Sequence, residues 1–247
     1  MNDQDLTPLA AAGAAFAAWI PEENLPFSFL LLEKKQRWDN ARAEGKTWLE
    51  ANDEQALKLL LPRVLDGPQS ACLFANLVSK LHGTKSPMNP KNSSELEKLL
   101  KIYGPDAGDL IRSVESLLAH DTIKNDEQWE LCCAALLALS GSDDEQSIEE
   151  EQFLEWFALE KSHVDAGRKI LNDLKSEGVL AKIYRLNSRQ KRFLAANLFA
   201  LMLCDGSWRP NEQEKLDEFT DKLHISRSEI ESLLKATYTM FNLSVFD

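Results

Sequence analysis

Residues 195–223, AANLFALMLCDGSWRPNEQEKLDEFTDKL, contain an almost wholly apolar segment, a short acidic turn and an amphipathic segment. The first segment has no polar stripe, so we expect a helix that is buried inside the protein. Gly206 suits the left-handed position just past a helix end, and Pro210 suits the first turn of the next helix. The inner stripe of the second helix is Leu216, Phe219, Thr220 and Leu223. The stretch therefore predicts two packed helices joined by a tight turn.

The order of residues around this turn is Asp205-Gly206-x-Trp208-x-x-x-Glu212, and Ser226-x-x-Glu229 follows the second helix. This pattern resembles that of the tellurite-resistance TerB-like family, over roughly residues 129–247. The resemblance implies an all-helical domain in which the turn occurs twice. It also implies a stress- or defence-associated, non-enzymatic protein whose acidic turns can bind a divalent metal. Arg209 departs from the family, in which a capping serine is common before the second helix.

Residues 129–160 resemble an earlier, degenerate copy of the same arrangement. An apolar run, WELCCAALLAL, is followed by the acidic turn SGSDDEQS and by the amphipathic run IEEEQFLEWFALE. Glu145 falls where Asp205 would, Gln146 replaces the glycine, and Gln152 falls where Glu212 would. These differences disfavour a metal site in the earlier copy. The predicted helices between the two copies cover residues 164–180 and 181–185.

The N-terminal half also predicts helices, separated by proline and glycine. They cover residues 8–20, 25–45, 53–65, 71–82, 95–103 and 106–119. Asn52 is expected to cap the third helix, and Pro62 is expected to kink or end it near Leu61. Period-two alternation never persists over a strand length, so the chain is predicted to be all-α and to form a compact multi-helix protein. We expect a helical region at residues 1–125 and a TerB-like domain at residues 126–247. The order of helices in the first region leaves open whether it is a diverged copy of the second.

The net charge of −12 is spread unevenly along the chain. Residues 1–125 carry 14 basic and 17 acidic side chains, whereas residues 126–247 carry 14 and 23. Residues 126–160 alone contain 11 acidic side chains and no lysine or arginine. Such a block repels phosphate backbones, so nucleic-acid binding by the C-terminal half is disfavoured. A solvated acidic face and a surface for a cation or a basic partner both remain open.

The cysteines and the apolar segments bear on the cellular compartment. Cys72, Cys132, Cys133 and Cys204 lie within apolar helical runs without CxxC spacing, which predicts buried thiols rather than disulfides or zinc ligands. No apolar run approaches the roughly 20 residues that span a bilayer. Residues 6–20 lack the basic residues that precede a secretory signal. We therefore expect a cytoplasmic protein.

Asp205 and Glu212 form the candidate metal site. An aspartate at the end of one helix and a glutamate in the first turn of the next can converge on one hard cation, such as calcium or magnesium. The spaced ligand ladder of an EF-hand is missing. The alternative is structural, because Asp205 can accept backbone N–H bonds and Glu212 favours a helix N-terminus. The sequence leaves both roles open.

Other chemistry has no positive signal in the sequence. His82, His120, His163 and His224 are scattered, and surface or loop positions are expected for them. No phosphate loop, nucleophile elbow or metal-hydrolase helix appears. We expect no enzyme and no cofactor other than a divalent cation. The leading hypothesis is a binding or scaffold protein with a protein partner. The alternatives are a metal-dependent hydrolase that uses Asp205 and Glu212, and a peripheral partner of a membrane-protein complex.

Overall fold

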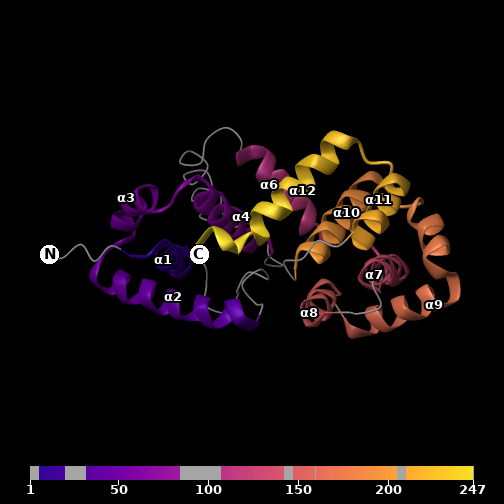
Figure 1. The fold of residues 1–247 in the computed structure, drawn as a ribbon, viewed down its shortest axis with the longest axis horizontal. Coiled ribbons are helices and arrows are strands. Elements are labelled where there is room, and N and C mark those ends of the chain that lie inside the picture. The colour runs from indigo at the N-terminus through magenta and orange to yellow at the C-terminus, as the bar shows by residue number, and fades with distance from the viewer. Residues whose placement is uncertain are drawn as a thin grey trace. The chain divides into compact units, whose positions relative to one another are not determined.

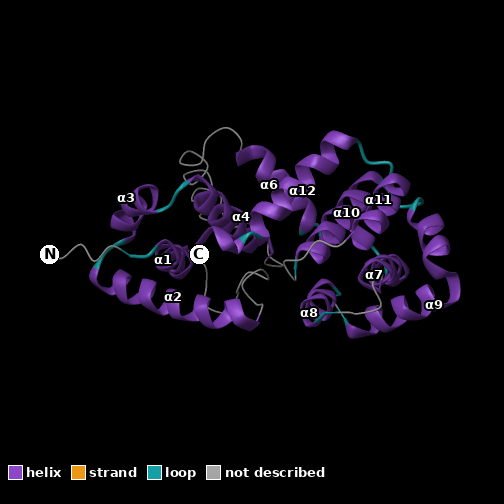
Figure 2. Cartoon of the chain, in the orientation of Figure 1, coloured by secondary structure: helices purple, strands orange, loops and turns teal. Residues whose placement is uncertain are grey.

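The computed structural model describes residues 6–19, 32–83, 107–141, 147–158, 160–204 and 210–246. In these ranges the chain forms α-helices and short 3-10 helices, and it forms no strand (Figure 2), which confirms the all-α prediction. No helix within the same ranges is long and apolar enough to cross a membrane. The helix predicted at residues 95–103 and the turn with Asp205, Gly206 and Trp208 lie outside the described residues.

The chain divides into two compact units. Unit 1 comprises Met1–Ile111 together with Asn242–Asp247, and unit 2 comprises Arg112–Phe241. This division differs from the predicted boundary between residues 125 and 126. Two buried amides explain why the residues just before 126 belong with unit 2. The Asn197 side chain donates to the Leu117 carbonyl at 3.0 Å, and the Gln190 side chain donates to the Thr122 carbonyl at 3.0 Å.

Unit 1 contains helices α1 (Pro8–Trp19), α2 (Leu32–Ala51), α3 (Glu54–Val64) and α4 (Gly67–Gly83), and the 3-10 helix η4 (Leu243–Phe246). Helix α1 lies against α2 at very short range (Figure 1). A Cβ atom added to Gly45 would lie 2.3 Å from the Ala14 backbone nitrogen, and one added to Gly13 would lie 2.6 Å from the Ala41 carbonyl oxygen. The two glycines therefore allow the helix backbones to approach, and the Phe16 ring meets the Trp38 ring edge-on at 5.0 Å.

Three details of unit 1 differ from the sequence prediction. Helix α2 continues past Gly45 to Ala51, because that glycine serves the contact with α1 rather than a helix end. The residue that caps α3 is Asp53 instead of Asn52, since its carboxylate accepts a hydrogen bond from the Ala56 N–H at 2.7 Å. Helix α3 also continues through Pro62 to Val64, so this proline does not end the helix near Leu61, and the alternative of a kink stays a prediction.

The residues after position 241 complete unit 1. Helix η4 buries Leu243 and Phe246. Arg37 donates a hydrogen bond to the Phe246 carbonyl at 2.7 Å, and the Gln69 side chain donates to the Val245 carbonyl at 2.9 Å. These contacts tie the segment to α2 and α4.

Helix α6 (Ala107–Leu117) crosses from unit 1 into unit 2, and Val114 and Leu117 on its second half are buried. Unit 2 continues with η2 (His120–Thr122), α7 (Asp126–Ser140), α8 (Ile148–Phe157), α9 (Lys161–Ile183), α10 (Ser188–Leu203), α11 (Pro210–Leu223) and α12 (Arg227–Phe241). The apolar helices predicted around residues 129–139 and 195–203 are α7 and α10, and both are buried along most of their length.

Helix α9 is bent, and its bend positions the groove that is described below. Lys175 has φ 58° and ψ 175°, which interrupts the helical conformation within Lys161–Ile183. The break between helices was predicted after residue 180, five positions later than the bend. Before the bend, Gly167 lets α9 pack closely on α7, since a Cβ atom there would lie 2.8 Å from the Cys133 Cβ. After the bend, one face of the helix turns toward the end of α11.

Candidate functional site

The structure describes the surroundings of the predicted metal residues only in part. Helix α10 ends at Leu203 and α11 begins at Pro210, as the sequence predicts. Asp205 lies outside the described residues, and Glu212 lies in α11 with its side chain also outside them. In the part of the chain that the structure describes, no group of three or more His, Cys, Asp or Glu side chains could hold a metal ion.

All four cysteines are buried thiols that form no disulfide, as predicted. Burial raises the pKa of the Cys72 and Cys133 thiols to about 12 and also raises that of Cys132. The thiolate is the nucleophilic form of cysteine, and at neutral pH these three thiols stay protonated. The cysteines therefore act as small apolar residues of the core.

The sequence predicts surface or loop positions for the histidines. His163 is buried in α9, so this prediction is wrong for it, and His120 is half-buried in the short connection η2. Their rings stack on the two sides of Trp129, with centroid distances of 5.7 Å and 6.1 Å. The rings of Phe157 and Phe193 complete this aromatic cluster, at 5.4 Å and 5.9 Å from Trp129. Burial lowers the pKa of His120, so its neutral form is favoured. The sequence could not reveal the cluster, because its members come from η2, α7, α8, α9 and α10.

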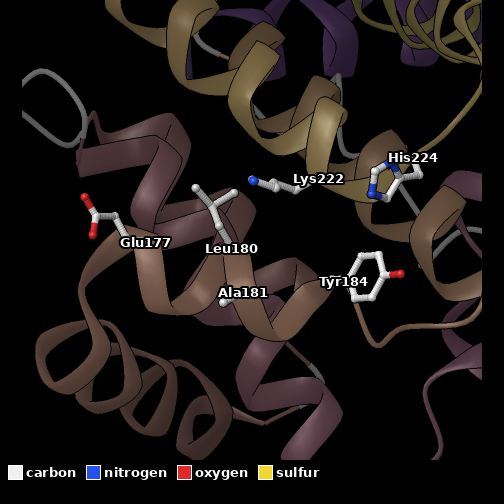
Figure 3. Close-up of a pocket in the computed structure, with 6 residues that line it drawn as sticks. All are labelled: Glu177, Leu180, Ala181, Tyr184, Lys222 and His224. Atoms are coloured by element: carbon white, nitrogen blue, oxygen red, sulfur yellow. The ribbon is translucent and has the colours of Figure 1, made fainter.

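An open groove lies between the second half of α9 and the end of α11 (Figure 3). We call it the α9–α11 groove. Its volume is about 390 Å³, and it is lined by Glu177, Leu180, Ala181, Tyr184, Lys222 and His224. Four of these residues, Glu177, Leu180, Ala181 and Tyr184, come from α9 and its C-terminal cap. They are three, one and three positions apart, so they share one helix face. The other two come from the last turn of α11 and from the residue that follows it.

The ring of Tyr184 contacts the side chains of His224 and Lys191. Tyr184 is 57% exposed. The His224 ring meets it edge-on at 5.5 Å, and the Lys191 Nζ lies 5.0 Å from its ring centre. His224 has φ 51°, a left-handed conformation that ends α11 and turns the chain. A non-glycine residue in this conformation is uncommon, and such residues concentrate at functional positions.

The two ends of the groove differ in charge. Lys222 extends across it near Leu180, and Glu177 lies at the opposite end from His224 and Tyr184 (Figure 3). Among the described residues, no carboxylate lies within ion-pair distance of Lys222 or Lys191. The neighbouring cations are paired: Arg189 contacts Asp121 at 3.3 Å, and Arg192 contacts Glu229 at 2.5 Å. Lys222 and Lys191 are therefore not engaged in ion pairs with the described residues, although Glu177 lines the same groove.

The sequence contains a signal for these basic side chains that the predictions above do not use. Residues 178–204 contain five basic side chains and no acidic one, although the chain as a whole has a net charge of −12. The basic residues are Lys182, Arg185, Arg189, Lys191 and Arg192. The contribution of Lys222 and His224 could not be inferred, because they reach the groove only through the packing of α11 beside α9.

Comparison of the chain with protein-family models, with curated proteins and with solved structures gives no match. The resemblance of residues 129–247 to the TerB-like family therefore stays a prediction. The chemistry of the α9–α11 groove is the basis for a functional proposal.

Proposed function

We propose that the chain is a non-enzymatic binding or scaffold protein that docks a partner protein at the α9–α11 groove. The observation that carries the proposal is the exposure of Tyr184, which is 57% exposed beside the apolar Leu180 and Ala181. Tyrosine combines a large apolar ring with a polar tip, and it is enriched where proteins meet. A volume of about 390 Å³ falls at the lower end of the range of ligand pockets, and it suits one anchoring side chain of a partner.

The biological setting of the proposal comes from the TerB-like resemblance. It supports a stress- or defence-associated role and a divalent cation, calcium or magnesium, at Asp205 and Glu212, and the buried thiols support a cytoplasmic location. Carboxylate oxygens are the ligands that these hard cations prefer. The cation would steady the connection between α10 and α11, and the second of these helices also provides Lys222 of the groove.

The docking function is tested by affinity capture from the native host, followed by mass spectrometry. Wild type, Tyr184→Ala and Tyr238→Ala serve as baits. Tyr238 is 55% exposed and does not line the groove, so it is a matched control. We expect a partner that wild type and Tyr238→Ala retain and Tyr184→Ala loses. Equal capture by all three baits would contradict docking at the groove. A membrane protein as the groove-dependent partner would support the peripheral-membrane alternative.

The cation is tested separately by thermal melting. A ligand that binds only the folded state raises the melting temperature by mass action. Millimolar calcium or magnesium should therefore stabilise the wild type but not Asp205→Asn. Identical melting curves for wild type with calcium, with magnesium and with a chelator would rule out this part of the proposal.

A further inference from the structure

We propose that the α9–α11 groove binds an acidic segment of a partner protein, in which an apolar side chain lies next to aspartate or glutamate. The inference rests on the proposed docking function and specifies the chemistry of the partner. Three properties of the groove carry it: its free positive charge, its apolar floor and its polarity from one end to the other.

The charge of the groove attracts carboxylates. Lys222 and Lys191 have no ion-pair partner in the described parts of the chain. The Lys222 side chain lies near Leu180 in the middle of the groove, and the Lys191 Nζ lies 5.0 Å from the centre of the Tyr184 ring (Figure 3). Residues 178–204 add further basic side chains and no acidic one. In a protein with a net charge of −12, lysines without an ion-pair partner are available to carboxylates of a ligand.

The floor of the groove requires an apolar group on the ligand. Leu180 and Ala181 form the centre, and the Tyr184 ring continues this surface toward His224 (Figure 3). Leu180 is already largely buried, whereas Ala181 and Tyr184 are exposed, and a small anion such as phosphate would leave these two side chains uncovered. A leucine-sized or phenylalanine-sized side chain would remove them from water, and the neighbouring carboxylates would meet the lysines.

The polarity of the groove fixes the direction of the ligand. Glu177 stands at the end opposite His224 and Tyr184, so a carboxylate is attracted at one end and repelled at the other. Acidic residues of the ligand therefore belong on the side of Lys222 and His224. Removal of the charge of Lys222 and removal of the charge of Glu177 should therefore change the affinity for an acidic ligand in opposite directions. A purely structural role of the two residues would not produce this difference.

A nucleic acid fits the groove less well than an acidic peptide. Phosphate backbones are bound by several cations that follow the strand. Here the exposed face of α11 next to Lys222 carries acidic residues, including Glu214, Asp217, Glu218 and Asp221. They would repel the flanking phosphates, whereas a short peptide engages only the groove.

The test is a fluorescence-anisotropy titration of the full-length protein at low ionic strength. The probe is a dye-labelled synthetic peptide in which one leucine is flanked by two glutamates on each side. Its counterparts have glutamine or lysine in place of glutamate, and a single-stranded oligothymidylate of similar charge serves as the nucleic-acid probe. We expect the glutamate peptide to bind about tenfold more tightly than the glutamine peptide, because several carboxylate–lysine pairs are lost together. Salt should weaken only the former.

Variants at the two ends make the test directional. Lys222→Gln should weaken binding of the glutamate peptide about threefold to fivefold, and Glu177→Gln should strengthen it by a similar factor. Lys235→Gln removes an exposed lysine that does not line the groove, and it should leave the affinity unchanged. All three residues are exposed, and melting curves of the variants verify that each one is folded.

Each outcome decides the inference. Equal binding of the glutamate and glutamine peptides, or equal effects of the three substitutions, would overturn it. Tighter binding of the oligonucleotide than of the glutamate peptide would overturn it in favour of a polyanion site. If no peptide binds while affinity capture still yields a Tyr184-dependent partner, the acidic segment is wrong and the docking function stands. If both experiments fail, the docking function is wrong as well.

Discussion

Gly45 determines how closely α1 and α2 can pack. A methyl group at this position would lie 2.3 Å from the Ala14 backbone nitrogen, so the helices would have to separate. Gly45→Ala should therefore destabilise the protein by about 1 to 3 kcal/mol, the usual cost of overpacking. Gly67 is a matched control, because nothing lies within 4 Å of a Cβ atom there. Chemical denaturation should show Gly67→Ala to be neutral or stabilised by up to about 1 kcal/mol. Equal stabilities of the two variants would contradict the close packing.

His120 makes the stability of unit 2 sensitive to mild acid. Its ring lies among those of Trp129, Trp156, Phe157 and Phe193. Burial is the main cause of its lowered pKa, and the hydrogen bond to the Leu118 carbonyl and the charge of the neighbouring Asp121 oppose it. Arg189 pairs with Asp121 and limits this second effect. The aromatic environment thus favours the uncharged ring.

The sign of the pH effect follows from proton uptake. The ordinary pKa of histidine is 6.5, and in the folded protein that of His120 is lower. Between these two values the unfolded chain binds a proton that the folded chain does not. Stability is therefore fully present above pH 6.5 and falls as the pH drops below it, by at most about 1.4 kcal/mol per pH unit for one group. Melting curves from pH 8 to pH 5 should show a smaller loss for His120→Gln than for wild type. Parallel curves would contradict the assignment.

Helix caps show how far local sequence determines the elements. Ser147 and Glu150 form a capping box at the start of α8, and Asn187 and Gln190 form one at the start of α10. Such ends can be predicted from residues three positions apart. The bend of α9 could not be predicted from the sequence, because a lysine at position 175 does not indicate a left-handed backbone. Nearby, a Cβ atom on Gly178 would lie 2.7 Å from the Leu174 Cβ, a closeness that follows from the bend and not from helical spacing.

The bend gives a prediction at the level of the helix. Lys175 has φ 58° and ψ 175°, a region that almost only glycine occupies and that costs other residues about 1 to 3 kcal/mol. Lys175→Gly should relieve this cost and raise the stability by about 1 kcal/mol, after the greater flexibility of glycine in the unfolded chain is deducted. Lys182 is an exposed lysine in the regular part of the same helix, so Lys182→Gly should lower the stability by about 1 kcal/mol. Denaturant titrations that show a loss for both variants would contradict the bend.

At the level of the whole molecule, the sequence predicts the helical class but only part of the organisation. The excess of acidic side chains that begins at residue 126 suggests a domain boundary there. Charged side chains lie mostly on the surface, however, whereas the division into units depends on buried contacts. Asn197 shows the difference: its side-chain amide reaches the carbonyl of Leu117, and both residues are buried. The groove is a similar case. The helical spacing of Leu180, Ala181 and Tyr184 can be seen in the sequence, whereas the approach of Lys222 requires the tertiary fold.

Two fragments test where unit 2 begins. Residues 112–241 contain the carbonyl groups of Leu117 and Thr122, whereas residues 126–241 leave the side chains of Asn197 and Gln190 without these partners. The loss of either hydrogen bond costs about 0.5 to 1.5 kcal/mol, because each amide keeps a second acceptor, and the shorter fragment also loses the buried Val114 and Leu117. The longer fragment should melt cooperatively and be more stable than the shorter one by several kcal/mol. Equal melting temperatures by circular dichroism would favour the boundary at residue 126.

The central claim is that the protein acts by docking a partner at the α9–α11 groove. Photo-crosslinking in the native host tests it most directly, with the full-length chain carrying benzoylphenylalanine at position 184 or, as the matched control, at position 238. Both tyrosines belong to unit 2 and are exposed to a similar extent, 57% and 55%. The proposal predicts a discrete crosslinked partner from position 184 and none from position 238. Crosslinks of equal yield from both positions, or from position 238 alone, would contradict it.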